Sequence, residues 1–206
     1  MYLSHRLTRG VLPDWWAKNE DPLIYLTFGS VTGQLPLSTD VFRTALDAVR
    51  GLPVRVLLTV GHGTDTSAFG AIPANVHVEE WVPQADVFGE AAMVVCHGGS
   101  ATVLGALAAG LPLVIVPIFA DQPDNARLVH EAGLGLGVRT GTEAEDRVGK
   151  IGPADAPRIR AAIEQVLADP SYRQAAGWVA DEMGVLPTVD ELISEVFTDL
   201  PGLLAG

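Results

Sequence analysis

The chain has 206 residues and a formal net charge of −12, with 25 acidic and 13 basic side chains. Neutralising a nucleic-acid backbone or an anionic membrane requires clustered Lys and Arg, and the 13 basic residues here are scattered, so neither is expected as a partner. Hydrophobic residues make up 48% of the chain and charged residues 18%, which predicts a folded domain with a full core.

The predicted elements begin after a polar and aromatic stretch. Residues 1–20 include the Pro-bearing segment VLPDWWAKN and are interpreted as a linker or N-terminal extension. Six apolar runs then predict strands, which are residues 23–29, 54–60, 75–79, 92–96, 113–117 and 135–138. Most of these runs are apolar on both faces, which is typical of a parallel sheet covered by helices on each side.

Segments with helical periodicity separate and follow these runs. Residues 38–51 contain a capping Ser38, a terminating Gly51 and one apolar stripe, made of Val41, Ala45, Leu46 and Val49. Residues 139–157 are rich in charge, Gly and Pro and predict a loop. The other predicted helices are residues 84–91, 100–109, 122–132, 156–168, 171–183 and 188–198. This alternation predicts a doubly wound, Rossmann-like α/β fold, with residues 21–206 forming one domain.

The stretch CHGGS, residues 96–100, lies where a predicted strand meets a predicted helix. This places it at the carboxyl edge of the sheet, where open α/β folds bind ligands. Gly98 and Gly99 allow the backbone to approach an anion, and the first N–H groups of the helix point toward it. His97 can donate a further hydrogen bond. The alternative is a glycine turn whose histidine satisfies a backbone carbonyl.

Several other site classes are excluded by their missing motifs. The chain has no GxxxxGK[ST] phosphate loop and no GxGxxG dinucleotide fingerprint. It has no GxSxG nucleophile elbow, which excludes an α/β-hydrolase. It also has no HExxH, no Cys-His metal spacing and no Asp-x-Asp pair, so no metal is expected. The lone Cys96 cannot form an internal disulfide and predicts a buried small residue.

Three segments together carry a family resemblance. The segments YLTFGSV (25–31), EEWVPQADVF (79–88) and CHGGSATVLGALAAGLPLVIVPIFADQPDNA (96–126) resemble the C-terminal half of GT-B glycosyltransferases. The resemblance is closest to bacterial enzymes that glycosylate macrolides and other natural products, and it runs from about Val11 to the end of the chain. The elements W-x-P-Q, H-x-G and D-Q occur in this order and spacing, which makes the combination specific.

The resemblance implies that this domain binds a UDP-sugar or dTDP-sugar. In such a site, Trp81 stacks on the pyrimidine, the backbone of Val82 meets the base edge, and Gln84 reaches the ribose. Asp121 and Gln122 bind the transferred sugar. The residues implied to hold the diphosphate are Gly29, Ser30, His97, Gly98, Gly99, Ser100 and Thr102. From the residues alone, a packing role for Trp81 and helix-capping roles for Gln84 and Asp121 remain the alternatives.

Two positions depart from the family pattern. Ala101 stands where many relatives have Gly, so we expect a slightly less open diphosphate turn. Gly105 stands where the related plant enzymes have an acidic residue that contacts the ribose, so that contact must be absent or supplied elsewhere.

The implied activity is sugar transfer with inversion by direct displacement, without a metal ion or another cofactor. The helix N-terminus and His97 stabilise the charge of the leaving diphosphate. The family's general base is a histidine of an N-terminal acceptor domain, which we expect to be absent from this chain, so no catalytic residue is assigned. His5 and His62 lie in no matching motif. The chain alone is therefore expected to bind nucleotide without catalysis.

Two alternatives remain open at this stage. One is a stand-alone module that binds nucleotide-sugars, and the other is half of a sugar-nucleotide epimerase. For location, no apolar run reaches the roughly 18 residues of a membrane span, and the N-terminus lacks the apolar region of a signal peptide. We therefore expect a cytoplasmic protein.

Overall fold

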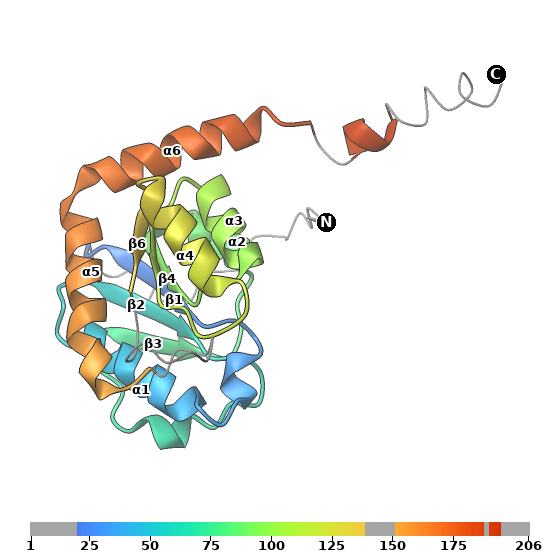
Figure 1. Ribbon diagram of the computed structural model, residues 1–206. Coiled ribbons are helices and arrows are strands. Elements are labelled where there is room, and N and C mark those ends of the chain that lie inside the picture. Colours follow the sequence, from blue (N-terminus) through green and yellow to red (C-terminus); the bar gives the residue numbers. More distant parts are fainter. Residues whose placement is uncertain (1–19, 139–150, 188–189, 195–206) are drawn as a thin grey trace, which may run out of the picture.

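A computed structural model describes residues 20–138, 151–187 and 190–194 (Figure 1). Residues 1–19 of the predicted linker, which include His5, and residues 139–150 of the predicted loop lie outside these ranges. Within the described ranges, no helix is both long and apolar enough to cross a membrane.

The core of the fold is a six-stranded sheet with the order β3-β2-β1-β4-β5-β6, and each neighbouring pair is parallel. This strand order is doubly wound, with the reversal between β1 and β4. The strands are β1 (Leu23–Thr27), β2 (Arg55–Thr59), β3 (Val76–Glu79), β4 (Ala91–Cys96), β5 (Leu113–Ile115) and β6 (Gly135–Gly137). The predicted fold class is therefore confirmed.

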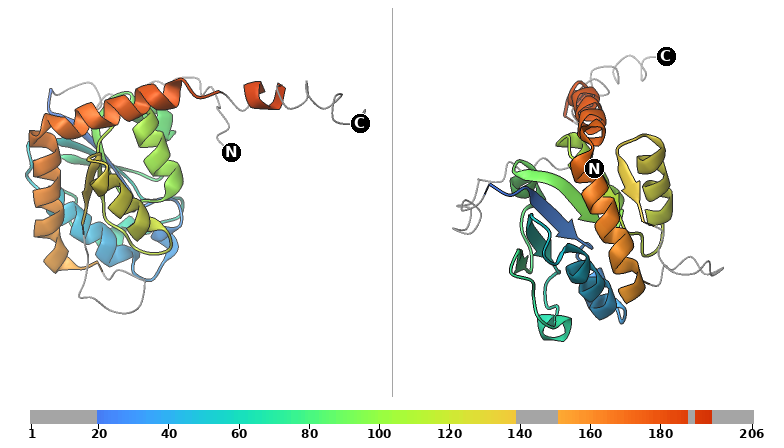
Figure 2. Two further views of the ribbon diagram at one scale, coloured as in Figure 1. Left: turned by 45° about the horizontal axis from the view of Figure 1, so that its top comes forward. Right: turned by 90° about the vertical axis from the view of Figure 1, so that its left-hand side faces the viewer.

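Helices cover both faces of this sheet (Figures 1 and 2). One face packs on α1 and α5, and the other packs on α2, α3 and α4, with α6 lying against α3. The helices are α1 (Ser38–Val49), α2 (Gln84–Phe88), α3 (Ser100–Ala108), α4 (Gln122–Glu131), α5 (Ala156–Ala168) and α6 (Pro170–Gly184). Short 3-10 turns occur at η1 (Thr32–Gln34), η2 (Thr66–Phe69) and η3 (Pro153–Asp155).

The predicted elements agree with the structure except at some of their ends. Ser38 does not cap α1, because Leu37 occupies the N-cap position and no side chain makes a capping bond. Gly51 follows the helix with φ of 71°, the left-handed conformation expected for a glycine at this place. The predicted helix 84–91 ends at Phe88, since the chain must extend again to enter β4.

Two predictions near the C-terminus need adjustment. The end of the predicted 139–157 loop is helical, because η3 leads directly into α5. Of the predicted helix 188–198, residues 190–194 are helical and the others lie outside the described residues. Cys96 is fully buried on β4, as predicted, and burial raises the pKa of its thiol to about 12.

The register of the central strands decides which loops meet. Thr27 at the end of β1 pairs with Thr59 on one side and Cys96 on the other, and Cys96 pairs in turn with Ile115. The loops that follow these four strands therefore leave the sheet side by side at its carboxyl edge. The predicted site residues Gly29 and His97 lie in two of these neighbouring loops.

Candidate functional site

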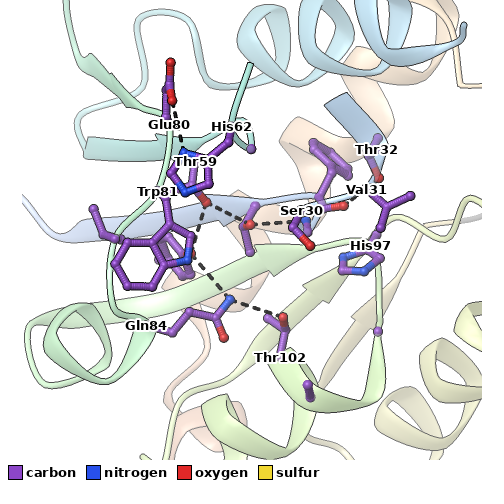
Figure 3. A pocket seen from close by; sticks show the side chains of 18 of the residues that line it. Ser30, Val31, Thr32, Thr59, His62, Glu80, Trp81, Gln84, His97 and Thr102 are labelled. Atoms are coloured by element: carbon purple, nitrogen blue, oxygen red, sulfur yellow. Dashed lines mark hydrogen bonds and ion pairs between the residues drawn. The ribbon is translucent and has the colours of Figure 1, made fainter. Parts of the chain in front are cut away.

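A cavity of about 630 Å³ opens at this carboxyl edge (Figure 3). Its walls come from the loops after β1 to β5 and from the starts of α2 and α3. Ten of the twelve predicted site residues line it, which are Gly29, Ser30, Trp81, Val82, Gln84, His97, Gly99, Ser100, Thr102 and Gln122. The two that do not line it are Gly98 and Asp121.

The imidazole of His97 is held between two glycines. A Cβ atom added at Gly29 would lie 3.0 Å from the ring, and one added at Gly99 would lie 2.6 Å from Nε2. Real Cβ contacts are essentially never as short as 2.6 Å and are rarely as short as 3.0 Å, so a larger residue at either position would require the ring to move. The glycines therefore fix the position of the imidazole as well as the path of the backbone.

The environment of His97 favours its neutral form. Burial lowers the pKa of the imidazole, and the backbone of Thr27 and the carboxylate of Asp121 offset this only in part. Nδ1 is buried and has no hydrogen-bond partner among the described residues, whereas Nε2 is the ring nitrogen closest to Gly99, which lines the cavity. An anion in the cavity would supply charge that favours protonation of this ring.

Gly98 forms part of the turn between β4 and α3 and packs closely on its neighbours. It has φ of 94°, and an added Cβ would lie 2.6 Å from the side chain of Ile115 and 3.2 Å from the backbone oxygen of Gln122. The turn therefore requires glycine both for its conformation and for its close packing on β5. Gly98 does not line the cavity, and its diphosphate contact stays a prediction.

The N-terminus of α3 faces the cavity with two different hydroxyls. Gly99 is the N-cap residue, and its carbonyl accepts from the backbone N–H groups of Thr102 and Val103. Thr102 is 5% exposed, and its Oγ1 accepts from Gln84 Nε2 at 3.3 Å, so its own proton is free to be donated. Ser100 instead donates its proton to Asp121 Oδ2 at 2.8 Å. Thr102 is thus the better placed hydroxyl donor for an anion.

Asp121 lies beside the cavity and is exposed. It occupies the N-cap position of α4, but its side chain makes no capping bond. Its carboxylate instead accepts from Ser100 and from Asn125 Nδ2, the latter at 3.1 Å. The hydrogen bond from Ser100 is the main cause that lowers the pKa of Asp121. The carboxylate is therefore ionised at neutral pH and held between α3 and α4, with Oδ1 left for a ligand.

Asn125 was not identified from the sequence, and it organises this corner of the site. Its Nδ2 donates to the backbone oxygen of Gly98 at 2.8 Å as well as to Asp121, and it lies 3.3 Å from Ser100 Oγ. It thereby ties α4 to the turn that precedes α3. Its position, four residues after Asp121 on one helix face, is the only sequence signal that it offers.

Gln122 is 3% exposed and holds the preceding loop. Its Oε1 accepts from the backbone N–H groups of Ile118 and Phe119, at 2.8 and 2.9 Å. This loop includes Ala120 with φ of 58°, a conformation that an alanine rarely adopts without such support. Only the amide nitrogen of Gln122 is left for a ligand in the cavity.

The other end of the cavity is aromatic. The Trp81 side chain is 56% exposed, and the His62 ring lies nearly parallel to it, with centroids 6.4 Å apart and planes inclined by 21°. His62 Nδ1 lies 3.1 Å from Glu80 Oε2. His62 lies in no family motif, and its side chain is exposed, but it also lines the cavity (Figure 3).

These features suit an elongated ligand with three chemical parts. The exposed indole can stack on a flat ring, the neutral imidazole and the α3 N-terminus can bind an anion, and the Asp121 carboxylate can accept from hydroxyls. Among the described residues, no group of three or more His, Cys, Asp or Glu side chains is arranged to hold a metal ion.

Residues 43–198 match the family described as "Erythromycin biosynthesis protein CIII-like, C-terminal domain". The chain belongs to this family. A relative from Mycobacterium bovis, "PGL/p-HBAD biosynthesis rhamnosyltransferase", is 32% identical over 177 residues, which are 85% of this chain and 35% of that protein. "Demethyllactenocin mycarosyltransferase" from Streptomyces fradiae is 34% identical over 58% of this chain and 26% of its own length.

Solved structures of glycosyltransferases share the fold of this chain. SnogD from Streptomyces nogalater has a TM-score of 0.71 and 29% identity, over 92% of this chain and 47% of its own. VinC in complex with DTDP has a TM-score of 0.71 and 26% identity, over 91% of this chain and 44% of its own. The predicted resemblance to natural-product GT-B glycosyltransferases is confirmed. The chain spans about a third of the length of its mycobacterial relative and just under half that of these structures.

Proposed function

We propose that residues 21–206 form the donor-binding domain of an inverting, metal-independent glycosyltransferase that transfers a sugar from a UDP-sugar or dTDP-sugar to a small-molecule hydroxyl. The observation that carries this proposal is that one cavity joins an exposed indole, a fixed imidazole and a helix N-terminus. The presence of DTDP in the VinC complex supports a nucleoside diphosphate as the ligand. The cytoplasmic location stays a prediction.

Trp81 and Gln84 bind the nucleoside in this proposal. Trp81 offers a flat apolar face, and a stacked ring contributes beyond its buried area. The backbone of Val82 follows directly and meets the base edge. Gln84 does not cap α2, because its amide is directed toward Tyr25 and Thr102. It is therefore available to the ribose.

The diphosphate lies between the two loops that hold His97. Donors on one side are the His97 ring, the Thr102 hydroxyl and the backbone of the first turn of α3, including Ser100. Gly29 and Ser30 approach from the other side. Because His97 is desolvated, its hydrogen bond to a phosphate is stronger than the same bond in water. Negative charge grows on the diphosphate as the sugar leaves, so these groups bind the transition state more tightly than the ground state.

The transferred sugar lies beside Asp121 and Gln122. The Asp121 carboxylate is ionised and oriented by Ser100 and Asn125, so it accepts charge-assisted hydrogen bonds from sugar hydroxyls. Gln122 donates from its amide nitrogen. The acceptor oxygen attacks the anomeric carbon from the opposite face, the bond to the diphosphate breaks, and the configuration inverts.

The proton of the acceptor hydroxyl goes to a base outside the described residues. In this proposal a histidine of an N-terminal acceptor domain supplies that base, and the two domains together form the active enzyme. The chain by itself binds the nucleotide-sugar and transfers no sugar. Sugar transfer by this chain alone, lost on mutation of His62, would overturn this division of roles.

Ligand-induced stabilisation tests the proposal. UDP or dTDP should raise the unfolding free energy by RT ln(1 + [L]/Kd), about 2.7 kcal/mol at a hundredfold excess over Kd. EDTA should not remove this effect. The absence of any stabilisation by either diphosphate at millimolar concentration would rule out the proposed function.

Two variants test which residue binds the nucleoside and which binds the diphosphate. Trp81→Ala should weaken binding of nucleoside and nucleoside diphosphate alike, because it removes the stacking face. His97→Ala should weaken binding of the nucleoside diphosphate and leave binding of the nucleoside unchanged. Calorimetry with uridine and UDP, and with thymidine and dTDP, measures both effects. Equal losses for both ligands in both variants would indicate general damage to the fold instead.

A further inference from the structure

A row of buried hydroxyls lies beneath the cavity. Tyr25 and Thr27 are two residues apart on β1, and Thr59 is paired with Thr27 on β2, so the three side chains share one face of the sheet. They are 2%, 2% and 6% exposed. The row begins at the Gly29 loop, where the backbone N–H of Gly29 lies 3.3 Å from Thr27 Oγ1. It ends at Gln84.

The hydrogen bonds of this row run in one direction. Thr59 Oγ1 donates to Thr27 Oγ1 at 2.9 Å. Since a hydroxyl has a single proton, Tyr25 must be the donor in its 3.0 Å bond to Thr59. The phenol oxygen of Tyr25 is then left as an acceptor. It accepts from Gln84 Nε2 at 3.4 Å, and the same nitrogen donates to Thr102 at 3.3 Å.

The row therefore determines which end of the Gln84 amide a ligand meets. The amide nitrogen is directed toward Tyr25 and Thr102, and the carbonyl oxygen lies on the opposite side (Figure 3). This oxygen has no hydrogen-bond partner among the described residues, and it is not one of their buried unpartnered atoms. Because Gln84 lines the cavity, this oxygen is the acceptor that its amide can offer to a ligand.

We infer that Tyr25, Thr27 and Thr59 are positioning residues that orient Gln84, so that the site selects a nucleotide whose ribose donates a hydroxyl proton to the Gln84 carbonyl. The inference rests on the proposed function and adds the residues that set its ribose preference. A hydroxyl in the ligand satisfies the carbonyl, whereas fluorine, which cannot donate, leaves it unpaired in the complex. Burying an unpaired acceptor lowers affinity.

Two substitutions disturb the row in different ways. Tyr25→Phe keeps the ring and its edge contact with Phe88, but it removes the acceptor that holds the amide nitrogen. The amide can then turn, because Thr102 is able to donate as well as accept. Thr59→Val keeps the shape of the side chain and removes the acceptor for the Tyr25 proton. That proton is then donated to Gln84, which turns the amide nitrogen toward the ligand.

The test compares UDP with analogues that carry fluorine in place of the 2′ or the 3′ hydroxyl. The wild-type chain should bind one of the fluoro analogues roughly three- to tenfold more weakly than UDP, the loss expected for one neutral hydrogen bond. This discrimination should fall to about twofold or less in Tyr25→Phe and Thr59→Val. Calorimetry gives the affinities, and circular dichroism with thermal melting shows that each variant is folded.

Matched controls are available in the same chain. Tyr172→Phe removes a phenol that is 3.1 Å from Gln165 Nε2, and Thr44→Val removes a buried hydroxyl that has no hydrogen-bond partner in the described part of the chain. Neither residue lines the cavity. Both controls should retain the full discrimination between hydroxyl and fluorine.

The outcomes separate the inference from the proposed function. If the wild-type chain binds neither UDP nor dTDP, the proposed function is wrong. If it binds UDP but does not distinguish the fluoro analogues, or if Tyr25→Phe and Thr59→Val keep the wild-type ratio, the orientation of Gln84 by the hydroxyl row is wrong. If a variant binds UDP and both fluoro analogues more weakly by the same factor, the ratio of affinities is unchanged, and the orientation of Gln84 by the hydroxyl row is likewise wrong.

Discussion

The close packing of His97 against Gly99 allows one steric experiment to test the diphosphate site. Gly99 has φ of −62° and ψ of 134°, which alanine adopts without strain, so Gly99→Ala adds a methyl group without changing the backbone. That methyl would lie 2.6 Å from His97 Nε2. An ordinary contact of about 3.4 Å requires the ring to move by roughly 0.8 Å, toward the Gly29 loop.

The expected effect is the loss of the hydrogen bond from His97 to the diphosphate. A donor displaced from about 2.9 Å to about 3.6 Å no longer makes a hydrogen bond. Bonds to charged groups contribute about 1.5 to 3 kcal/mol, so UDP or dTDP should bind roughly ten- to a hundredfold more weakly. The free nucleoside should bind as before. A separate cost in unfolding free energy, up to about 1 kcal/mol, follows from alanine at an N-cap position.

Calorimetry on four proteins measures this effect, and a double-mutant cycle assigns its cause. The proteins are the wild type, Gly99→Ala, His97→Ala and the double variant. If the methyl acts through the ring, it should cost little once the ring is absent. Gly89→Ala is the matched control, because a Cβ there meets no atom within 4 Å. An equal cost of Gly99→Ala with and without the His97 ring, or no cost at all, would refute the argument.

Three further predictions concern neighbouring groups. Asp121→Ala should weaken the nucleotide-sugar by roughly tenfold or more while sparing the bare diphosphate, as measured by calorimetry with matched ligands; equal losses would show that Asp121 does not contact the sugar. Gln122→Ala should lower the unfolding free energy by about 1 to 3 kcal/mol in urea, because it leaves the backbone N–H groups of Ile118 and Phe119 without their acceptor, and Gln122→Glu should retain most of the stability. Burial lowers the pKa of His97 in the folded state, so below about pH 6.5 the unfolded chain binds more protons than the folded chain does. The unfolding free energy of the wild type should therefore fall as the pH is lowered through this range, by at most about 1.4 kcal/mol per pH unit. His97→Gln should lose this slope in urea titrations between pH 5 and 7.5, and an unchanged slope would show that the His97 pKa is not lowered.

The elements of the fold and part of the site were predictable from sequence because their causes are local. Runs that are apolar on both faces belong to strands buried between helices, and each of the six predicted runs overlaps one strand of the sheet. The turn at residues 97–99 was predictable since it needs only a strand end, two glycines and a helix start. Trp81, Gln84 and His97 followed from motifs whose spacing matches a known family.

Other site residues depend on contacts between segments that are distant in the sequence. Thr59 reaches the site only because β2 pairs with β1 in the register that places it beside Thr27. Asn125 acts through the turn before α3, which lies 27 residues earlier. His62 stands beside Trp81 because two loops leave adjacent parallel strands at one edge. No sequence motif around Thr59, Asn125 or His62 predicts these contacts.

The tertiary structure also shows contacts of the predicted site residues that the sequence did not indicate. Gly98 turns toward Ile115, Ser100 donates its proton to Asp121, and Gln122 supports a loop. The sequence by itself determined the order of strands and helices along the chain, the position of the glycine turn and the types of side chain that the candidate site contains. These follow from hydrophobic periodicity, backbone preference and motif spacing. Only the tertiary structure decided which donor faces which acceptor. A hydroxyl or an amide can bond in several directions, and its direction is set by the partners that strand register and helix packing bring within about 3 Å.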